Sequence, residues 1–293
     1  MDNKRCKETK DTTLTTFDEN DIPGLIALSQ LVGWDYDERE IHTVLSSGKI
    51  FGHKNNDGKI VSSGAIIPYD TFLASIGMVI VDPAYRGKGL GRDVTQTCID
   101  AVPDEMAIML IATNEGIPLY ESMGFSEVDC IHKFLCEKHR TSKPLAATAD
   151  FKIEPLRTGD LDEISHLDKQ AYGDIRKQFL LNRIDQAKDC IVLKDRRGKV
   201  IGYGLSILGP VNLILGPIVA PSNDAASILL YELSRNHNGK LRIDVPSGHD
   251  LFLKFIQGCG FEKVNQPPIM ILNADKMPER NQTYYGIAAQ VFG

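Results

Sequence analysis

The chain has 293 residues, 42% of them hydrophobic and 25% charged, and these proportions exclude a disordered, collagen-like or coiled-coil protein. Single hydrophobic cores stop growing near this length, so we expect two domains. The formal net charge of −6 argues against a nucleic-acid partner, which needs a basic surface, and favours cationic small molecules.

The sequence is expected to belong to a cytoplasmic protein without a membrane partner. No run reaches the roughly 18 apolar residues of a membrane span. The first residues are polar and lack the apolar stretch of a secretory signal. The six cysteines are scattered without CxxC spacing, which is typical of reduced thiols in the cytosol.

The first half is expected to alternate strands and helices. Residues 18–23 combine acids and a proline as a helix start does, and apolar residues then recur at helical spacing. The turn at 55–58 indicates a hairpin. The predicted strands lie at 13–17, 49–53, 59–68, 75–81, 107–112 and 128–136. Four helices are predicted: one after residue 21, one at 37–45, one from a glycine-rich loop to about residue 101, and a short one near residue 119.

The second half repeats this order about 140 residues further on, which indicates a tandem duplication. Segments 198–204, 215–221 and 259–261 match 58–64, 78–83 and 123–125 in pattern. A polar stretch without periodicity lies between the halves. We therefore expect two mixed α/β domains at 1–140 and 151–293, joined by a linker at 141–150.

A glycine-rich loop lies between the strand ending at Val81 and the following helix. Gly87, Gly89 and Gly91 let the backbone turn its amides toward a phosphate or pyrophosphate at the helix N-terminus. Arg86 and Arg92 add positive charge, whereas the Lys88 side chain is expected to point to solvent. A Rossmann loop is excluded because Arg92 stands where its last glycine belongs, and a Walker A loop because Gly89 replaces the required Ser or Thr.

This loop resembles the acyl-CoA signature R/Q-x-x-G-x-G/A of the GNAT acetyltransferase superfamily, met by Arg86, Gly89 and Gly91. Residues 110–125, ending in Gly124-Phe125, are similar to the family's second cofactor segment. The resemblance covers most of residues 10–140. It implies an α/β (mixed α+β) fold of two tandem GNAT-like domains, each with a mostly antiparallel, centrally splayed mixed sheet flanked by helices.

The resemblance also implies an acetyl-CoA site without a metal. The strand before the loop would contact pantetheine and the acetyl group, and the loop amides would bind the pyrophosphate. Thr113 stands where many relatives have an asparagine. The implied cofactor-binding residues are Val79, Ile80, Val81, Arg86, Gly87, Lys88, Gly89, Leu90, Gly91, Arg92 and Thr113.

Tyr120 stands where the family commonly places the tyrosine that protonates the departing CoA thiolate. The resemblance therefore implies direct attack of an amine on the thioester, with Tyr120 as general acid and a strand amide near Val79 or Val81 holding the oxyanion. The alternative is that Tyr120 only anchors its helix to the core.

The segment between the first two helices often borders the acceptor site in this family. It contains the only tryptophan, Trp34, beside Asp35 and Tyr36, and these residues suit a cationic amine. Asp35, Asp37 and Glu38 are candidates for the general base. The alternative is that Trp34 only packs into the corner between the helices.

The second half departs from the family pattern because residues 222–227 lack glycine and place Asp224 where a pyrophosphate would lie. Ser222 or Asn223 is expected to cap a helix instead. We therefore predict no cofactor there, although this half resembles a YitH-type C-terminal acetyltransferase domain. It would complete the acceptor pocket, to which residues 284–286 are expected to contribute, or stiffen the first domain. Leu251, Leu253, Phe255 and Ile256 are predicted to be core residues.

Cys130, His132, Cys136 and His139 are residue types that bind zinc, but they follow one strand without the chain reversal that a four-ligand site needs. We predict no metal. The leading functional hypothesis is an N-acetyltransferase acting on a primary amine of a small molecule. The alternatives are acetylation of a protein or peptide amine and a non-catalytic acyl-CoA sensor.

Overall fold

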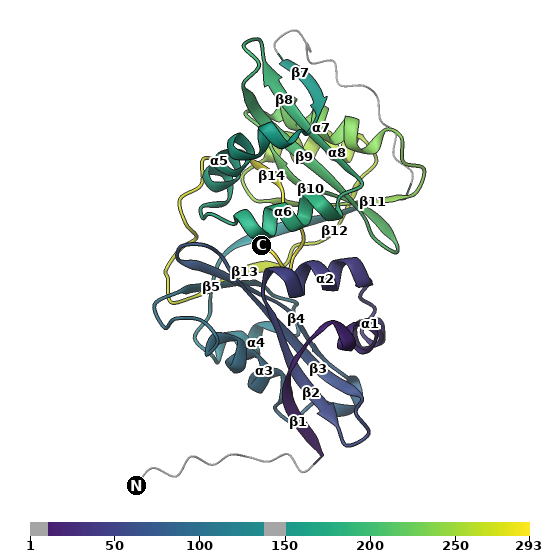
Figure 1. Cartoon of the computed structure of the whole chain (residues 1–293), viewed down its shortest axis with the longest axis vertical. Helices are drawn as coiled ribbons and strands as arrows, with labels where there is room; N and C mark the ends of the chain where they lie inside the picture. Colours follow the sequence, from purple (N-terminus) through teal and green to yellow (C-terminus); the bar gives the residue numbers. More distant parts are fainter. Residues whose placement is uncertain (1–10, 138–150) are drawn as a thin grey trace.

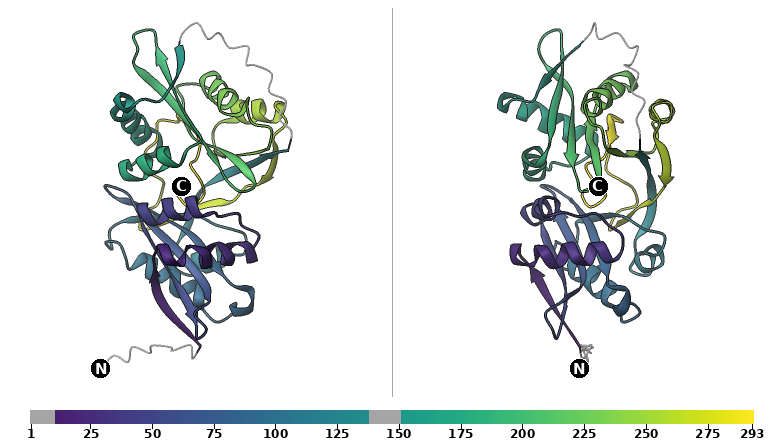
Figure 2. Two further views of the ribbon diagram at one scale, coloured as in Figure 1. Left: turned by 45° about the vertical axis from the view of Figure 1, so that its right-hand side comes forward. Right: turned by 90° about the vertical axis from the view of Figure 1, so that its right-hand side faces the viewer.

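The computed structural model describes residues 11–137 and 151–293. The fourteen strands of these residues form one continuous, mostly antiparallel sheet, and helices pack on its faces. The two halves are stacked along the long axis, and the C-terminus lies between them (Figures 1 and 2). The mixed α/β fold predicted from the sequence is confirmed. None of the helices described is long and apolar enough to cross a membrane.

The first half has the predicted order of elements, with ends displaced by a few residues. The short 3₁₀ turn Glu19–Asp21, capped by Asp18, leads into the first helix, as its acids and proline indicated. The elements are β1 (Thr12–Phe17), α1 (Ile22–Leu31), α2 (Glu38–Ser47), β2 (Lys49–Asn55), β3 (Ile60–Pro68), β4 (Leu73–Val81), α3 (Leu90–Ile99), β5 (Ala107–Ile111), α4 (Ile117–Glu121) and β6 (Ser126–Cys136).

The second half repeats this order and ends in additional short strands. Its elements are β7 (Phe151–Pro155), α5 (Leu161–Tyr172), α6 (Lys177–Gln186), β8 (Asp189–Asp195), β9 (Val200–Leu208), β10 (Asn212–Val219), α7 (Asn223–Ser234), β11 (Lys240–Pro246), α8 (Asp250–Gly258), β12 (Glu262–Asn265), β13 (Pro268–Leu272) and β14 (Tyr284–Gly286).

Helix α8 corrects part of the predicted core. Phe252 and Ile256, four residues apart and therefore on one helix face, are fully buried. Leu251 points away from that face and is 65% exposed, so its assignment to the core was wrong. Leu253 and Phe255 are half-buried against the same cluster.

The two halves exchange strands at the centre of the sheet, where the order is β5-β13-β6-β11. Strand β13 of the second half lies antiparallel between β5 and β6 of the first. The second part of β6, from Ile131 to Cys136, pairs with β11 of the second half. The domain limits 1–140 and 151–293 therefore stay a prediction, because each of these two segments contributes a strand to the sheet of the other. The predicted linker 141–150 lies outside the described residues.

Helices α2 and α6 join the halves through a buried polar cluster. The Glu40 Oε2 atom accepts hydrogen bonds from Arg183 Nη1 at 2.5 Å and from Gln186 Nε2 at 2.8 Å. Arg183 also donates to the backbone oxygen of Ala288 at 2.6 Å. Around this cluster, one continuous hydrophobic core takes side chains from both halves, from Leu28 to Phe292. The halves are therefore packed as one body.

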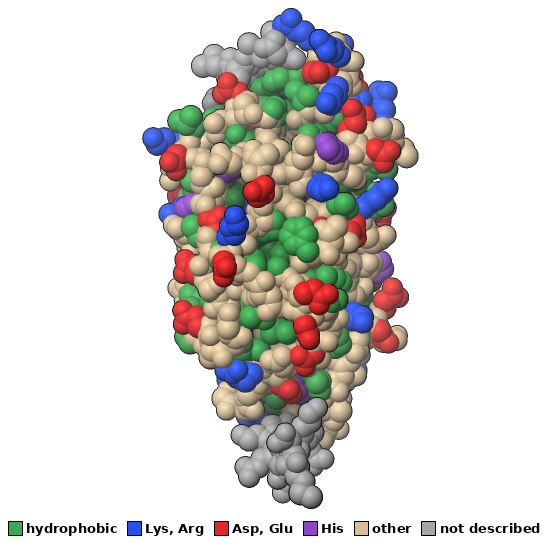
Figure 3. Space-filling model, turned by 90° about the vertical axis from the view of Figure 1, so that its left-hand side faces the viewer, with side chains coloured by type: hydrophobic (Ala, Val, Ile, Leu, Met, Phe, Trp, Pro, Cys, Tyr) green, Lys and Arg blue, Asp and Glu red, His purple; other side chains and the backbone are tan. Residues whose placement is uncertain are grey.

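Charges of both signs are interspersed on the face shown in Figure 3, without a continuous basic surface among the residues drawn in colour. The formal net charge of the whole chain is −6.

A chain that ends at Glu137 tests the strand exchange. It lacks β13, the strand that pairs with both β5 and β6. The facing backbone groups of β5 and β6 then lose their hydrogen-bond partners and form exposed strand edges. We expect this fragment to aggregate or to lack a cooperative thermal transition in near-ultraviolet circular dichroism, whereas the full chain unfolds in one transition. A soluble fragment with its own sharp transition would contradict the structural role given to the exchange.

Candidate active site

Strand β4 separates from its parallel neighbour halfway along its length. It pairs with β5 only from Leu73 to Ile76 and then continues alone to Val81, which is the splay that the resemblance implied. On its other side, Met78 and Val79 have no register partner on β3, and Met78 has a left-handed φ of 52°. This is a β-bulge, which turns backbone groups out of the ladder and toward the opening between the strands.

The turn after β4 is fixed by Asp82. Its carboxylate accepts hydrogen bonds from the Ala84 amide at 2.9 Å and from Lys59 Nζ at 2.8 Å. The bond from Lys59 holds the pKa of Asp82 below its usual value, and the same bond raises the pKa of Lys59. This turn starts the glycine-rich loop at a defined point next to β4.

The loop then forms the N-terminus of α3. Gly87 and Gly89 have positive φ angles of 76° and 85°, and Gly89 is the N-cap of the helix. The amides of residues 87–89 make no backbone hydrogen bond with other described residues. Together with the first free amides of α3 they form a positively polarised site that suits a pyrophosphate.

A cleft of about 600 Å³ runs from the bulge to this loop. It brings together the cofactor-binding residues predicted from the sequence, apart from Lys88. The Lys88 side chain is exposed, and its Nζ lies 4.8 Å from the centre of the Tyr85 ring. The predicted residues that line the cleft are Val79, Ile80, Val81, Arg86, Gly87, Gly89, Leu90, Gly91, Arg92, Thr113 and Tyr120.

Tyr120 lies on α4 with 8% of its surface exposed and lines the cleft. Gly116 permits this position, because a Cβ there would lie 2.8 Å from the tyrosine ring. The Tyr120 hydroxyl has no hydrogen-bond partner among the described residues. Burial raises the pKa of the phenol, with a smaller effect of Cys98, so the hydroxyl keeps its proton at neutral pH.

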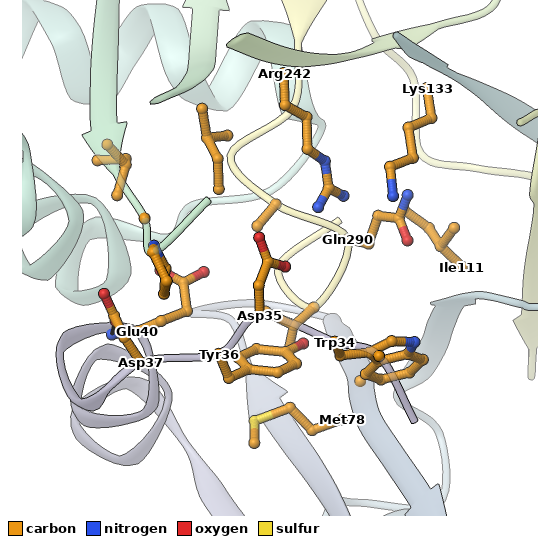
Figure 4. A pocket seen from close by; sticks show the side chains of 18 of the residues that line it. Trp34, Asp35, Tyr36, Asp37, Glu40, Met78, Ile111, Lys133, Arg242 and Gln290 are labelled. Carbon is orange, nitrogen blue, oxygen red and sulfur yellow. Dashed lines mark hydrogen bonds between the residues drawn. The ribbon is translucent and has the colours of Figure 1, made fainter. Parts of the chain in front are cut away.

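A second, smaller pocket of about 160 Å³ adjoins the cleft. Trp34 and Thr113 line both spaces, so the two meet there. The predicted acceptor residues Trp34, Asp35 and Tyr36 form one wall (Figure 4). Of the other carboxylates in that segment, Asp37 lines the pocket but caps α2 by accepting from the Glu40 amide at 2.8 Å, and Glu38 is exposed and outside the lining.

The opposite wall comes mainly from the second half, together with Lys133 near the end of β6, and sequence reasoning did not identify its individual side chains. Figure 4 shows Lys133 of β6 and Arg242 of β11 pointing into the pocket from above, beside Gln290 of the C-terminal tail. The hairpin between β9 and β10, residues 207–210, also lines it. The one signal in the sequence is that each of Lys133 and Arg242 is a charge beside apolar residues of its strand.

The tail that follows β14 crosses from the second half to the first. The Ser75 hydroxyl donates to the Val291 carbonyl at 2.9 Å, and the Tyr69 hydroxyl donates to the Phe292 carbonyl at 2.5 Å. A Cβ at position 77 would lie 2.5 Å from Val291, so Gly77 lets the tail lie against β4. The expectation that 284–286 line the pocket was wrong by a few residues, because 289–291 do so.

Strand β14 lies where the second half would open a cleft of its own. Strands β10 and β11 pair only at 212–214 before they separate, as β4 and β5 do. Strand β14 then pairs with β10 at Ile218 and Val219, and the Ile287 amide donates to the Asp244 carbonyl of β11 at 2.9 Å. The predicted cap of α7 is confirmed, since the Ser222 hydroxyl accepts from the Ala225 amide at 3.3 Å. The gap between β10 and β11 is thus bridged by the chain itself.

Three of the four residues considered for zinc lie on β6, and His139 lies outside the described residues. Within the part of the chain that is described, no three His, Cys, Asp or Glu side chains gather closely enough to hold a metal ion.

Comparison with known proteins decides the family. A profile described as "Acetyltransferase (GNAT) family" matches residues 12–125, and one described as "Acetyltransferase (GNAT) domain" matches residues 164–286. A Bacillus subtilis protein described as the uncharacterized N-acetyltransferase YitH is 35% identical over 281 residues, which cover 96% of this chain and 98% of that protein. The chain belongs to the GNAT family of N-acetyltransferases.

Solved structures support the tandem GNAT fold. A candidate acetyltransferase from Pyrococcus horikoshii superposes with a TM-score of 0.79 at 20% identity, covering 96% of both chains. A tandem GNAT protein from the clavulanic acid biosynthesis pathway superposes with a TM-score of 0.67 at 14% identity, covering 89% of this chain and 98% of its own. GNAT membership implies an acyl-CoA co-substrate.

Replacement of Gly89 tests the loop. A Gly89→Ala side chain must adopt a left-handed backbone, at a cost of about 1–2 kcal/mol, and would turn the amides away from the pyrophosphate. We expect the Kd for CoA, measured by calorimetry, to rise about tenfold, which corresponds to ~1.4 kcal/mol. Gly58→Ala is the matched control, because Gly58 has a φ of 80°, equally open surroundings, and a place in the distant β2–β3 turn. Equal CoA affinity of the Gly89→Ala and Gly58→Ala variants would show that the loop does not bind the cofactor.

Proposed function

We propose that this GNAT protein transfers an acetyl group from acetyl-CoA to the primary amine of a small molecule. The observation that carries the proposal is the pocket, lined from both halves, that meets the cofactor cleft at Trp34 and Thr113. The second half covers this pocket with the β9–β10 hairpin and the C-terminal tail. A pocket of about 160 Å³ suits a small molecule better than a folded protein or a peptide.

In this proposal the loop at Gly87–Arg92 binds the pyrophosphate and the acetyl group lies at the bulge of β4. The amine attacks the thioester carbonyl directly, and the Val79 amide, which is free of the β3 ladder, holds the oxyanion. Such donors contribute on the order of 10²–10³ in rate.

Tyr120 gives its proton to the departing thiolate. Support comes from its place in the cleft, its free hydroxyl and its raised pKa. Asp35 is the proposed acceptor of the amine's proton, because its side chain lies in the pocket without a hydrogen bond to other described residues.

The second half is proposed to bind no cofactor. Strand β14 occupies the position between β10 and β11 that corresponds to the cofactor cleft, and a capped helix replaces the glycine-rich loop. We therefore expect one acetyl-CoA per chain.

The Tyr120→Phe variant tests the proton donor. It keeps the ring that packs on Phe125 at a centroid distance of 5.9 Å and removes only the hydroxyl. We expect kcat to fall about 10²-fold or more, the range of general acid catalysis, while the Kd for acetyl-CoA stays the same. An unchanged kcat would exclude Tyr120 from the chemistry.

A thiol-release assay with acetyl-CoA tests the proposed activity. The acceptors are a panel of amino acids, polyamines, aminosugars and peptides, and calorimetry provides the number of acetyl-CoA molecules bound per chain. We expect release of CoA with at least one small amine and a stoichiometry of one. Turnover of peptides alone would favour a peptide acetyltransferase, and tight binding without any turnover would favour an acyl-CoA sensor.

A further inference from the structure

The pocket that adjoins the cofactor cleft is lined by charged side chains of both signs. Trp34, Tyr36 and Met78 form the floor on the side of β4 (Figure 4). Asp35 extends from this side with its carboxylate toward Arg242. Lys133 and Arg242 lie on the ceiling, on the side of the second half.

Both cations stand on one face of the sheet. Strands β6 and β11 are antiparallel neighbours in which Lys133 is opposite Asp244 and Arg242 is opposite Leu135. Residues directly opposite each other point to the same face, as do residues two apart on one strand. The strand exchange therefore places Lys133 and Arg242 side by side above the pocket.

Only one of these two cations, Arg242, has a counter-ion among the described residues. Arg242 donates to Asp244, with Nη2 at 2.6 Å from Oδ2, so this pair is close to neutral. Lys133 has no hydrogen bond or ion pair with any described residue, although it is half-buried. Burial lowers the pKa of Lys133, and the neighbouring Arg242 lowers it further, while the carboxylates of Asp244 and Asp35 act in the opposite direction.

The carboxylates on the other side are not equivalent. Glu40 is bound by Arg183 and Gln186, and Asp37 caps α2. Asp35 alone among these three has no hydrogen bond or ion pair with described residues, although its charge acts on both Arg242 and Lys133 across the pocket. An anion and a cation that lack direct partners among the described residues line the same pocket, which suits a ligand that carries both an amine and a carboxylate.

We propose that the acceptor is a small amino acid-like molecule whose carboxylate binds Lys133 and Arg242 while its amine lies beside Asp35 and faces the thioester. The inference rests on the proposed acetyl transfer. The rings of Trp34 and Tyr36, with centroids 6.2 Å apart, would flank the ammonium group before it loses its proton. A polyamine lacks the carboxylate and would place a second positive charge against Lys133.

The test uses matched acceptors that differ only in the carboxylate. The full-length protein is assayed for thiol release with the common amino acids and 4-aminobutyrate, each beside its carboxamide. We expect the best acceptor to carry a free carboxylate and its carboxamide to be poorer by about 10–100-fold in kcat/KM, the range of one charged hydrogen bond.

Lys133→Met should remove this preference. It lowers kcat/KM for the carboxylated acceptor about 10–100-fold and leaves the carboxamide almost unchanged. Lys133→Arg, which keeps the charge, should retain part of the preference. Lys254→Met is the control, because Lys254 is an exposed lysine on α8 outside the pocket. The Kd for acetyl-CoA should be the same in all variants.

Two results would overturn the inference. In the first, the wild type prefers amines without a carboxylate, such as polyamines. In the second, Lys133→Met lowers kcat/KM equally for a carboxylated acceptor and for its carboxamide. Failure of the acetyl transfer itself is a separate outcome, since then no amine supports thiol release. In that case calorimetry on the CoA-saturated protein still compares binding of each amino acid with that of its carboxamide, and equal affinities would contradict the inference.

Discussion

The structure depends on the exchange of β6 and β13 between the two halves. Strand β13 pairs with β5 on one side and β6 on the other, and β6 continues into the sheet of the second half beside β11. Removing either strand would leave buried backbone groups of its neighbours without partners, which is costly in a sheet interior. The exchange therefore fixes the halves against each other.

This constraint explains how one duplicated fold provides two different parts of a site. The first half keeps the splayed strands and the glycine-rich loop, whereas β14 occupies the corresponding opening of the second half. The chain then returns to the first half, and its tail lies on β4 beside Gly77. The second half thus supplies the ceiling and one side of the pocket next to the cleft, and the buried cluster around Glu40 holds these walls in place.

Local signals in the sequence predicted what is local in the structure. The strands and helices, the turn at Gly87 and Gly89 and the cap at Ser222 follow from short patterns whose physical basis lies within a few residues, whereas Tyr120 was indicated by the family resemblance. The exchange of strands between the two halves could not be predicted from the sequence. Strands β6 and β13 look like ordinary strands, and no neighbouring residue indicates which strands they pair with. For the same reason Lys133 and Arg242 were missed, since their place in the pocket results from pairing between strands that are far apart in the chain.

Native-state hydrogen exchange of the full chain tests the central claim that the exchanged strands make the two halves one cooperative body. The amides of β6 and β13 should open with the same free energy as the innermost amides of β3 and β9, which is the free energy of global unfolding. The claim would be contradicted if the β13 amides exchanged through a much smaller opening free energy while β3 and β9 kept their full protection.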